Sequence, residues 1–271
     1  MAAAASANDK FPKVQGGGSL ILAWQIRNKH VLVVGGGEVA AGRILNVLNA
    51  DAIVTVVCPA DGLNPEVRHR VANNEVHHID RVFEPSDLES LPASNGNAPD
   101  MVMCAIDDPA ASTQVWKLCK QHRIPANIAD VPPECDFYFG AVHRDGPLQV
   151  MVSTNGKGPR LAASIRNFIA KSLPPNVGDA ITQVGTLRSK LRQIAPKTEE
   201  GPKRMRWITR VSDAYSWNDM VDLTDEDMDN LLKFYGPNKV PDLDVLKGMR
   251  GGREAEEIDV FDGSFGFCIG V

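Results

Sequence analysis

A glycine-rich turn near the start of the chain limits the possible folds more than any other feature. The apolar run at residues 30–34 leads into GGGEVA at residues 35–40, which fits the pattern G-x-G-x-x-G/A, and a helical periodicity follows. Gly35 permits the tight turn, Gly37 lets a diphosphate approach the backbone, and Ala40 lets helix and strand pack closely. The amides and dipole at a helix start also attract a diphosphate. The turn therefore predicts a dinucleotide-binding βαβ unit.

Strand-like and helix-like segments alternate through the first half of the chain. Short apolar or β-branched runs lie at residues 30–34, 53–57, 76–79, 101–106 and 124–129. A helix is expected between the last two, with Asp108 as N-cap, Pro109 in the first position and His122 near the end. Such alternation predicts a parallel sheet, so we expect a Rossmann-like α/β domain over residues 19–143.

The pattern changes after the expected parallel sheet. Two further strands are predicted at residues 137–142 and 148–153, joined by a turn at 143–147 that contains Asp-Gly. Beyond residue 159 the chain reads as mainly helical, in segments at 160–172, 178–194, 201–216 and 224–235. We therefore expect a disordered lead-in, the Rossmann-like domain, a central segment, an all-α C-terminal domain and an acidic, Gly-rich tail, at residues 1–18, 19–143, 144–173, 174–236 and 237–271.

Positive and negative charges are separated along the chain. The formal net charge of −5 argues against a general nucleic-acid binder. Residues 151–211 nevertheless contain twelve Lys and Arg against three acids, whereas residues 212–271 contain fourteen acids against five bases. The basic region indicates an anionic ligand. The alternative is a solvated helical face that happens to be basic.

Cysteine, histidine and hydropathy patterns exclude several classes of protein. The five cysteines are scattered without a C-x-x-C pair, which is typical of reduced thiols and not of a disulfide framework or a zinc site. The histidines form no metal-binding motif, so no resident metal is expected. No apolar run reaches about 18 residues, and the N-terminus lacks the features of a secretory signal. We expect a cytoplasmic protein without a membrane span.

The second strand lacks a carboxylate that the dinucleotide fingerprint usually places at its end. That strand ends VCPA, and Asp61 comes late. The adenosine ribose would then be held mostly by the backbone around Pro59 and Ala60. Because no Arg stands there to hold a 2′-phosphate, the sequence favours NAD over NADP.

Asp130 closes the fifth expected strand in the sequence NIAD. Ligands in doubly wound sheets bind beyond the carboxyl ends of the strands, so a carboxylate there is placed to take and return protons. The alternative is a turn-initiating aspartate before the sequence VPP.

A second loop offers hydroxyls and cations at a helix start. Residues 153–160 read STNGKGPR and run from a strand into a helix, which can bind an anion or a carboxylate. The candidate ligand-binding side chains are Ser153, Thr154, Lys157 and Arg160. The spacing is not that of a P-loop. The alternative is a simple connector with Pro159 in the first helical position.

Three of these segments together resemble a known family. HVLVVGGGEVA, NIAD followed by PPECDFYFGA, and VSTNGKGPRLAASIR closely resemble the fungal-type bifunctional sirohaem synthase, a precorrin-2 dehydrogenase and sirohydrochlorin ferrochelatase. They also resemble the N-terminal half of the bacterial multifunctional enzyme. The resemblance covers residues 19–235 in the same order and leaves the first eighteen residues and the tail unexplained.

The resemblance implies NAD-dependent oxidation of precorrin-2 to sirohydrochlorin, followed by insertion of Fe(II) as a substrate to give sirohaem. It implies a homodimer with residues 144–173 as the dimerisation segment. It assigns Asp130 as an acid/base shared by both reactions, and it assigns NAD contacts to Gly35, Gly37, Glu38, Val39, Pro59 and Ala60. Cations from residues 157–210 would suit the anionic tetrapyrrole substrate.

Three other functions remain open at this point. The chain could be a precorrin-2 dehydrogenase only, although its DFYFGA segment favours the bifunctional form. A different NAD-dependent oxidoreductase acting on a small organic acid would predict a compact substrate domain with a catalytic His or Lys. A non-enzymatic NAD-sensing module would need no placed carboxylate, and both of these rest on a fold that hosts many functions.

Overall fold

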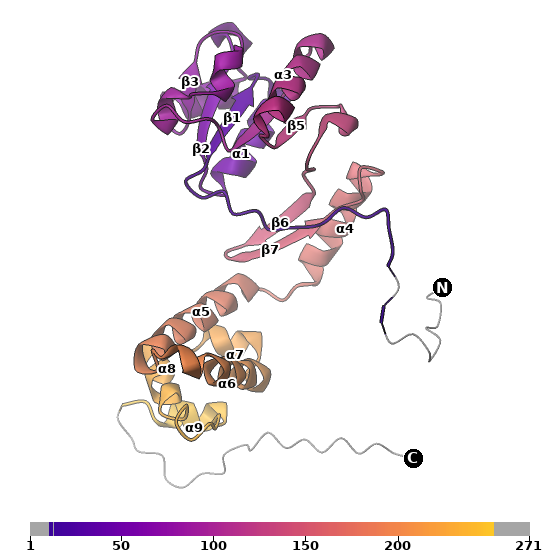
Figure 1. The fold of residues 1–271 in the computed structure, drawn as a ribbon. Coiled ribbons are helices and arrows are strands. Elements are labelled where there is room, and N and C mark those ends of the chain that lie inside the picture. Colours follow the sequence, from indigo (N-terminus) through magenta and orange to yellow (C-terminus); the bar gives the residue numbers. More distant parts are fainter. Residues whose placement is uncertain (1–10, 13, 252–271) are drawn as a thin grey trace. The chain divides into compact units, whose positions relative to one another are not determined.

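The computed structural model describes residues 11–12 and 14–251 of the chain. The chain divides into two compact units, drawn as ribbons in Figure 1. The first unit holds the chain up to Phe139 together with Asn155–Gly158. The second holds Gly140–Thr154 and the chain from Pro159 onward.

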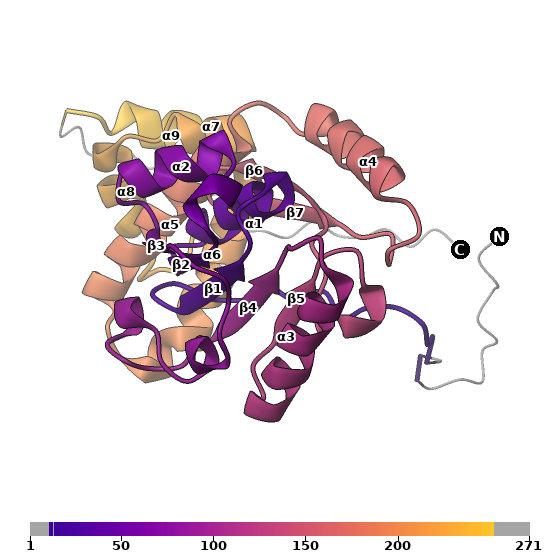
Figure 2. The ribbon, with the colours of Figure 1, turned by 90° about the horizontal axis from the view of Figure 1, so that it is seen from above.

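The first unit is built on a five-stranded parallel sheet with the order β3-β2-β1-β4-β5, which Figure 2 shows side by side. The strands are β1 (His30–Val34), β2 (Ile53–Val57), β3 (His77–Ile79), β4 (Met101–Cys104) and β5 (Ala126–Ile128). The strand order reverses between β1 and β4, and such a switch point is where doubly wound sheets bind ligands. The predicted Rossmann-like parallel sheet is confirmed.

Helices cover both faces of this sheet because alternate strand residues point to opposite sides. In β1, Val31 and Val33 join the apolar cluster beneath α1 (Glu38–Leu48) and α2 (Pro65–Ala72). Leu32 and Val34 join the opposite cluster, under α3 (Pro109–His122). The short 3-10 helices are η1 (Ala60–Gly62), η2 (Pro85–Leu88), η3 (Pro92–Ser94) and η4 (Pro132–Glu134).

The expected start of α3 is confirmed. The side chain of Asp108 accepts hydrogen bonds from the backbone N of Ala110 and Ala111 at 2.8 and 3.1 Å, and Pro109 occupies the first turn. This arrangement satisfies amides that have no partner within the helix. It fixes the chain directly after β4, where the candidate site lies.

The second unit begins with an antiparallel hairpin of β6 (Ala141–Asp145) and β7 (Leu148–Val152). The predicted strand at residues 137–142 and the five-residue turn after it were wrong. Asp145 pairs with Leu148, so only Gly146 and Pro147 form the turn. Gly146 has a φ of +52° and Pro147 a fixed negative φ, a combination suited to a two-residue hairpin turn.

The residues just before the hairpin, up to Phe139, belong to the first unit and do not extend β6. Phe137 packs edge to face against Trp24 at 5.6 Å and against Phe139 at 5.9 Å, measured between ring centroids. Its carbonyl oxygen accepts a hydrogen bond from Asn127 Nδ2 at 2.7 Å. These contacts explain why the aromatic run, which has the composition of a strand, forms none.

The rest of the second unit is helical, as predicted. Its helices are α4 (Pro159–Ser172), α5 (Val177–Ile194), α6 (Gly201–Ala214), α7 (Trp217–Val221), α8 (Asp225–Leu232) and α9 (Leu243–Gly248), with a 3-10 turn η5 (Thr198–Glu200). Trp207 lies fully buried at the centre of their core, and its Nε1 donates to the carbonyl oxygen of Lys239 at 2.8 Å. Helix α6 ends earlier than expected because Ser216 and Asp219 form the capping box of α7.

The helical unit extends beyond the expected boundary at residue 236. Val240, Leu246 and Met249 are buried in the helical core, although residues 237–271 were expected to be a tail. Arg250 then binds the fully buried Asp227, with an N–O distance of 2.7 Å. The rest of the expected tail and most of the expected lead-in lie outside the described residues. Within the described ranges, no helix is long and apolar enough to cross a membrane.

Candidate functional site

The glycines of the turn between β1 and α1 differ in how much space surrounds them. Gly35 has a φ of +106°, and a Cβ on it would lie 2.2 Å from the carbonyl oxygen of Ala105. A Cβ on Gly36 would lie 2.6 Å from Cδ2 of Leu63. Only glycine fits at Gly35, whereas a side chain at Gly36 would require Leu63 to move, so the turn holds α1 close against the ends of β1 and β4.

Gly37 differs from its neighbours because a Cβ there would meet nothing within 4 Å. It is the N-cap of α1 and has no side chain to accept hydrogen bonds from the first amides of the helix. Glu38 and Val39 follow it and are exposed. An open helix start of this kind can bind a diphosphate, with free amides and the positive end of the helix dipole.

A cavity of about 400 Å³ opens beside this turn, at the carboxyl ends of β1, β2 and β4. Gly35, Cys58 and Pro59 line it from the ends of β1 and β2. The segment after β3, the end of β4 and one side of α3 complete the wall with Asp107, Asp108 and further residues that the sequence did not single out: Val82, Phe83, Pro85, Ile106, Ala111, Gln114 and Val115. These side chains are mostly apolar, which suits the flat faces of a nucleotide base.

A carboxylate from the neighbouring strand β3 reaches the turn that follows β2. Asp80 follows β3, and its Oδ1 accepts a hydrogen bond from the backbone N of Ala60 at 2.7 Å. Burial raises the pKa of the Cys58 thiol, and the nearby carboxylates of Asp61 and Asp80 raise it further. The turn at Pro59 and Ala60 is therefore flanked by two carboxylates, of which the sequence alone did not place that of Asp80.

Asp130 stands at the carboxyl end of β5 with its side chain exposed. Its φ is +59°, a conformation that Asp and Asn tolerate better than most residues with a Cβ. The backbone N of Val131 contacts the carbonyl oxygen of Ile128 at 3.4 Å across this turn. Asp130 thus shapes a turn and also presents a carboxylate, so the two interpretations of this residue are compatible. The first unit alone does not desolvate it.

Arg43 is a residue near Asp130 that sequence reasoning missed. Arg43 lies on α1. It donates a hydrogen bond to the carbonyl oxygen of Cys104, the last residue of β4, at 2.8 Å, and another to that of Asn127 in β5 at 3.4 Å. Burial lowers the pKa of its guanidinium, while the nearby Cys135, Cys104 and Asp130 act in the opposite direction. An arginine remains charged even so. It therefore supplies a positive charge near the candidate catalytic carboxylate.

The loop at residues 153–160 is divided between the two units. Lys157 belongs to the first unit and is exposed, and Arg160 begins α4 in the second unit and is also exposed. Ser153 and Thr154 are half-buried after β7. Within each unit these side chains lie at or near the surface, as a binding role requires.

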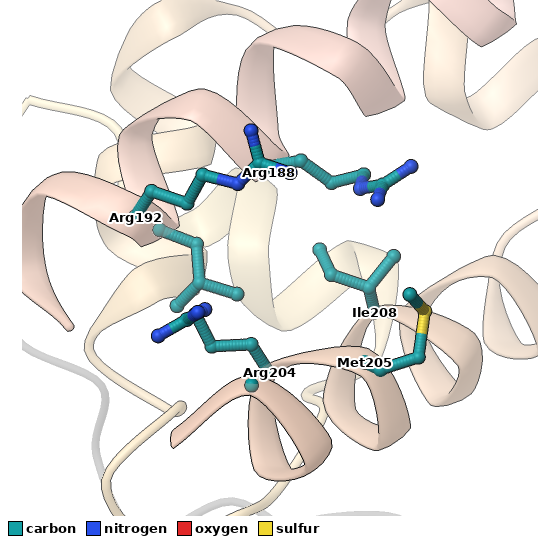
Figure 3. Close-up of a pocket in the computed structure, with 7 residues that line it drawn as sticks. Arg188, Arg192, Arg204, Met205 and Ile208 are labelled. Atoms are coloured by element: carbon teal, nitrogen blue, oxygen red, sulfur yellow. The ribbon is translucent and has the colours of Figure 1, made fainter. Parts of the chain in front are cut away.

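The basic region of the second unit forms a pocket between α5 and α6. Its volume is about 140 Å³. Figure 3 shows Arg188 and Arg192 of α5 on one side of it and Arg204 of α6 on the other. Leu191, Met205 and Ile208 provide an apolar wall. Arg204 donates to the carbonyl oxygens of residues 195 and 197, at 2.6 and 2.7 Å, and so closes the end of α5. Arg188 and Arg192 are exposed.

Among residues 11–12 and 14–251, no group of three or more His, Cys, Asp and Glu side chains could hold a metal ion. The parallel sheet, the open glycine turn and the cavity at its switch point define a Rossmann-type NAD(P)-binding protein. The NAD(P)-binding family model accordingly matches residues 22–141.

Two further family models narrow the class. The central region of sirohaem biosynthesis proteins matches residues 145–172, and their C-terminal region matches residues 174–241. The siroheme biosynthesis protein of Schizosaccharomyces pombe is 51% identical over 232 residues, covering 86% of this chain and 85% of that protein. The siroheme biosynthesis protein of Saccharomyces cerevisiae is 31% identical over 230 residues, covering 73% and 83%. The chain belongs to the sirohaem biosynthesis protein family.

A solved structure is similar over most of the chain as well. A precorrin-2 dehydrogenase superposes with a TM-score of 0.57 at 19% sequence identity, covering 81% of this chain and 100% of that one. At this identity the likeness concerns the fold.

Proposed function

We propose that this protein oxidises precorrin-2 to sirohydrochlorin with NAD and then inserts Fe(II) to give sirohaem. The observation that carries the proposal is a juxtaposition within the first unit. The open dinucleotide turn, the cavity beside it and the exposed carboxylate of Asp130 all lie at the carboxyl edge of one sheet. A hydride acceptor and a proton acceptor can then act on one substrate there.

The residues around the turn suit a dinucleotide. The space above Gly37 leaves room for the diphosphate at the start of α1. Gly35, Glu38 and Val39 complete that side, and Pro59 and Ala60 meet the adenosine ribose. NAD supplies the hydride-accepting nicotinamide when bound.

Asp130 serves as the acid/base of both reactions. In the oxidation it takes the proton that leaves the macrocycle along with the hydride. In the insertion it accepts the pyrrole N–H protons that Fe(II) displaces, one after the other, and passes them to solvent because it is exposed. The guanidinium of Arg43 places a positive charge near this carboxylate.

The tetrapyrrole substrate carries several carboxylates, and the basic residues of the chain suit it. Ser153, Thr154, Lys157 and Arg160 are the proposed contacts at the start of α4. The pocket between Arg188, Arg192 and Arg204 is a further place where a carboxylate can bind, since a guanidinium donates two parallel hydrogen bonds to one.

A homodimer formed through residues 144–173 is supported by an apolar stripe on α4. Leu161, Ile165 and Phe168 recur at helical spacing, and 61%, 39% and 72% of their surfaces are exposed. Adjacent exposed apolar side chains of this size favour a protein partner. A second copy satisfies the stripe by pairing it with itself about a two-fold axis.

We also propose that the protein works in the cytoplasm. The four cysteines in the described part of the chain are free, and three of them are buried, as expected of thiols that are kept reduced.

The test is an anaerobic assay in two stages with the full chain. Precorrin-2 and NAD are added first, and NADH and the tetrapyrrole spectrum are followed. Fe(II) is then added, with a protein-free sample as control. NADH formation followed by protein-dependent growth of the sirohaem spectrum supports the proposal. Oxidation with iron insertion no faster than in the control would leave a dehydrogenase only, and no oxidation at all would refute the proposal.

A further inference from the structure

Asp80 occupies the level in the sheet at which a dinucleotide-binding domain usually presents its ribose-binding acid. That acid normally ends the second strand. Here β2 and β3 pair in parallel with Val57 opposite Ile79, and the N of Cys58 bonds the carbonyl oxygen of Ile79 at 3.2 Å. Asp80 is therefore level with Cys58, one strand further out, which is about 4.8 Å in a sheet.

The side chain of Asp80 spans that gap. Its Oδ1 accepts a hydrogen bond from the backbone N of Ala60 at 2.7 Å, across the turn that follows β2. The residue is exposed, so its second carboxylate oxygen is accessible to a ligand at this turn. A carboxylate from β3 thus stands where the fingerprint places one from β2.

The carboxylates at this turn repel a phosphate, although one guanidinium, that of Arg68, also lies there. Asp61 adds a second carboxylate at the same turn. Together with Asp80 it helps to raise the pKa of the Cys58 thiol. Arg81, the next residue along the chain, is bound to Asp87 through two parallel hydrogen bonds of 2.9 and 2.6 Å. Arg68 of α2 donates to the carbonyl oxygen of Asp61 at 3.4 Å. The cation closest in sequence to Asp80 is therefore held by another carboxylate.

We propose that Asp80 selects NAD over NADP, by offering its carboxylate to the adenosine ribose hydroxyls and by repelling a 2′-phosphate. It also fixes the turn at Pro59 and Ala60 on which the ribose rests. The proposal rests on the NAD binding proposed above. It replaces the earlier argument that NAD is favoured because an Arg is missing, and it assigns the preference to a charge that is present.

Binding of reduced dinucleotides by the full chain tests this without turnover. Dissociation constants for NADH, NADPH and deamino-NADH are measured by fluorescence for the wild type, Asp80→Asn and Asp61→Asn. Asparagine keeps the shape of aspartate, and its amide oxygen can still accept the hydrogen bond from Ala60. Asp61→Asn is the matched control, because it removes the same charge from the same turn without touching that hydrogen bond.

The wild type is expected to prefer NADH over NADPH. Asp80→Asn should narrow this preference by about tenfold, mainly through tighter NADPH binding, and Asp61→Asn by less than about threefold. Unchanged preference in Asp80→Asn, or an equal change in Asp61→Asn, would overturn the proposal. The proposal would also be overturned if Asp80→Asn changed only the affinity for NADH relative to deamino-NADH. That result would assign Asp80 to the adenine amine and not to the ribose. A wild type that binds no dinucleotide would refute the proposed cofactor, and this inference with it.

Discussion

The guanidinium of Arg43 donates a hydrogen bond to the carbonyl oxygen of Cys104 at 2.8 Å, and this bond ties α1 to the carboxyl end of β4. The helix that begins at the dinucleotide turn is thereby fixed to the strand end beside the candidate catalytic carboxylate. The same guanidinium reaches the carbonyl oxygen of Asn127 in β5 at 3.4 Å. One side chain thus links the proposed cofactor site to the turn that presents Asp130.

Replacing Arg43 should cost stability. Arg43→Met fills a similar volume but removes both hydrogen bonds, while the carbonyl oxygen of Cys104 keeps its bond from the backbone N of Ala129 at 2.9 Å, so we expect a loss of about 1–2 kcal/mol in the free energy of unfolding. Urea unfolding measures this loss. Arg68→Met on α2, where the guanidinium is exposed, is the control and should change stability by less than about 0.5 kcal/mol. Equal effects of the two substitutions would contradict the role given to Arg43.

Gly35 and Gly37 should respond differently to the same substitution. Gly35→Ala places a Cβ 2.2 Å from a backbone oxygen at a φ of +106°, so it should destabilise the fold and abolish NADH binding. Gly37→Ala meets nothing within 4 Å and should fold normally, yet its methyl group enters the space proposed for the diphosphate. We therefore expect weaker NADH binding at nearly unchanged melting temperature. Normal NADH affinity in Gly37→Ala would argue against this placement of the cofactor.

The ion pair between Asp227 and Arg250 makes the helical unit sensitive to acid. The hydrogen bond from Arg250 is the largest cause that lowers the pKa of Asp227 from 3.8 to about 2. A group whose pKa is lower in the folded state contributes stability above its unfolded pKa and loses it as pH falls through the folded one. Asp227→Asn should therefore be less stable than the wild type at pH 7, and the difference should shrink between pH 4 and pH 2. Urea unfolding across that range tests this. A difference that does not depend on pH would contradict it.

The apolar stripe on α4 should control assembly. Phe168→Asp puts a charge on its most exposed member, and we expect the dimer to dissociate in sedimentation velocity experiments at micromolar concentration. Asn167→Asp adds the same charge at the neighbouring exposed position of the helix and serves as the control. It should leave assembly unchanged. Dissociation of both variants, or of neither, would count against a dimer formed through this stripe.

The sequence was sufficient to predict the parallel sheet because four of its five strands, all except β3, are short and mainly apolar runs that are buried on both faces, with a helix between most of them. Prediction from the sequence failed where the composition of a segment indicates one structure and its contacts in the fold impose another. The aromatic run at residues 137–139 has strand composition, but its rings and carbonyls are used by the first unit. Helix α9 was missed because its apolar residues are few and stand among acids, and its burial depends on the core formed by the preceding helices.

The sequence predicted only those residues of the candidate site that a local pattern marks. Gly35, Gly37 and Asp130 are encoded locally, by a turn motif and by a strand end. Arg43 and Asp80 act through contacts with residues 61 and 20 positions away in the chain. No pattern along the sequence predicts such contacts. An aspartate directly after a strand of a parallel sheet is nevertheless a signal, and it could have identified Asp80 as it identified Asp130.

The most direct test of the account compares the wild type with Asp130→Asn in both reactions. Asparagine tolerates the φ of +59° that Asp130 adopts, so the turn and the fold should be kept, and melting temperature and NADH affinity check this. We predict that both precorrin-2 oxidation and Fe(II) insertion fall by about 100-fold or more, because one proton acceptor serves both. A variant that binds NADH normally and retains either reaction at the wild-type rate would contradict the shared role of Asp130.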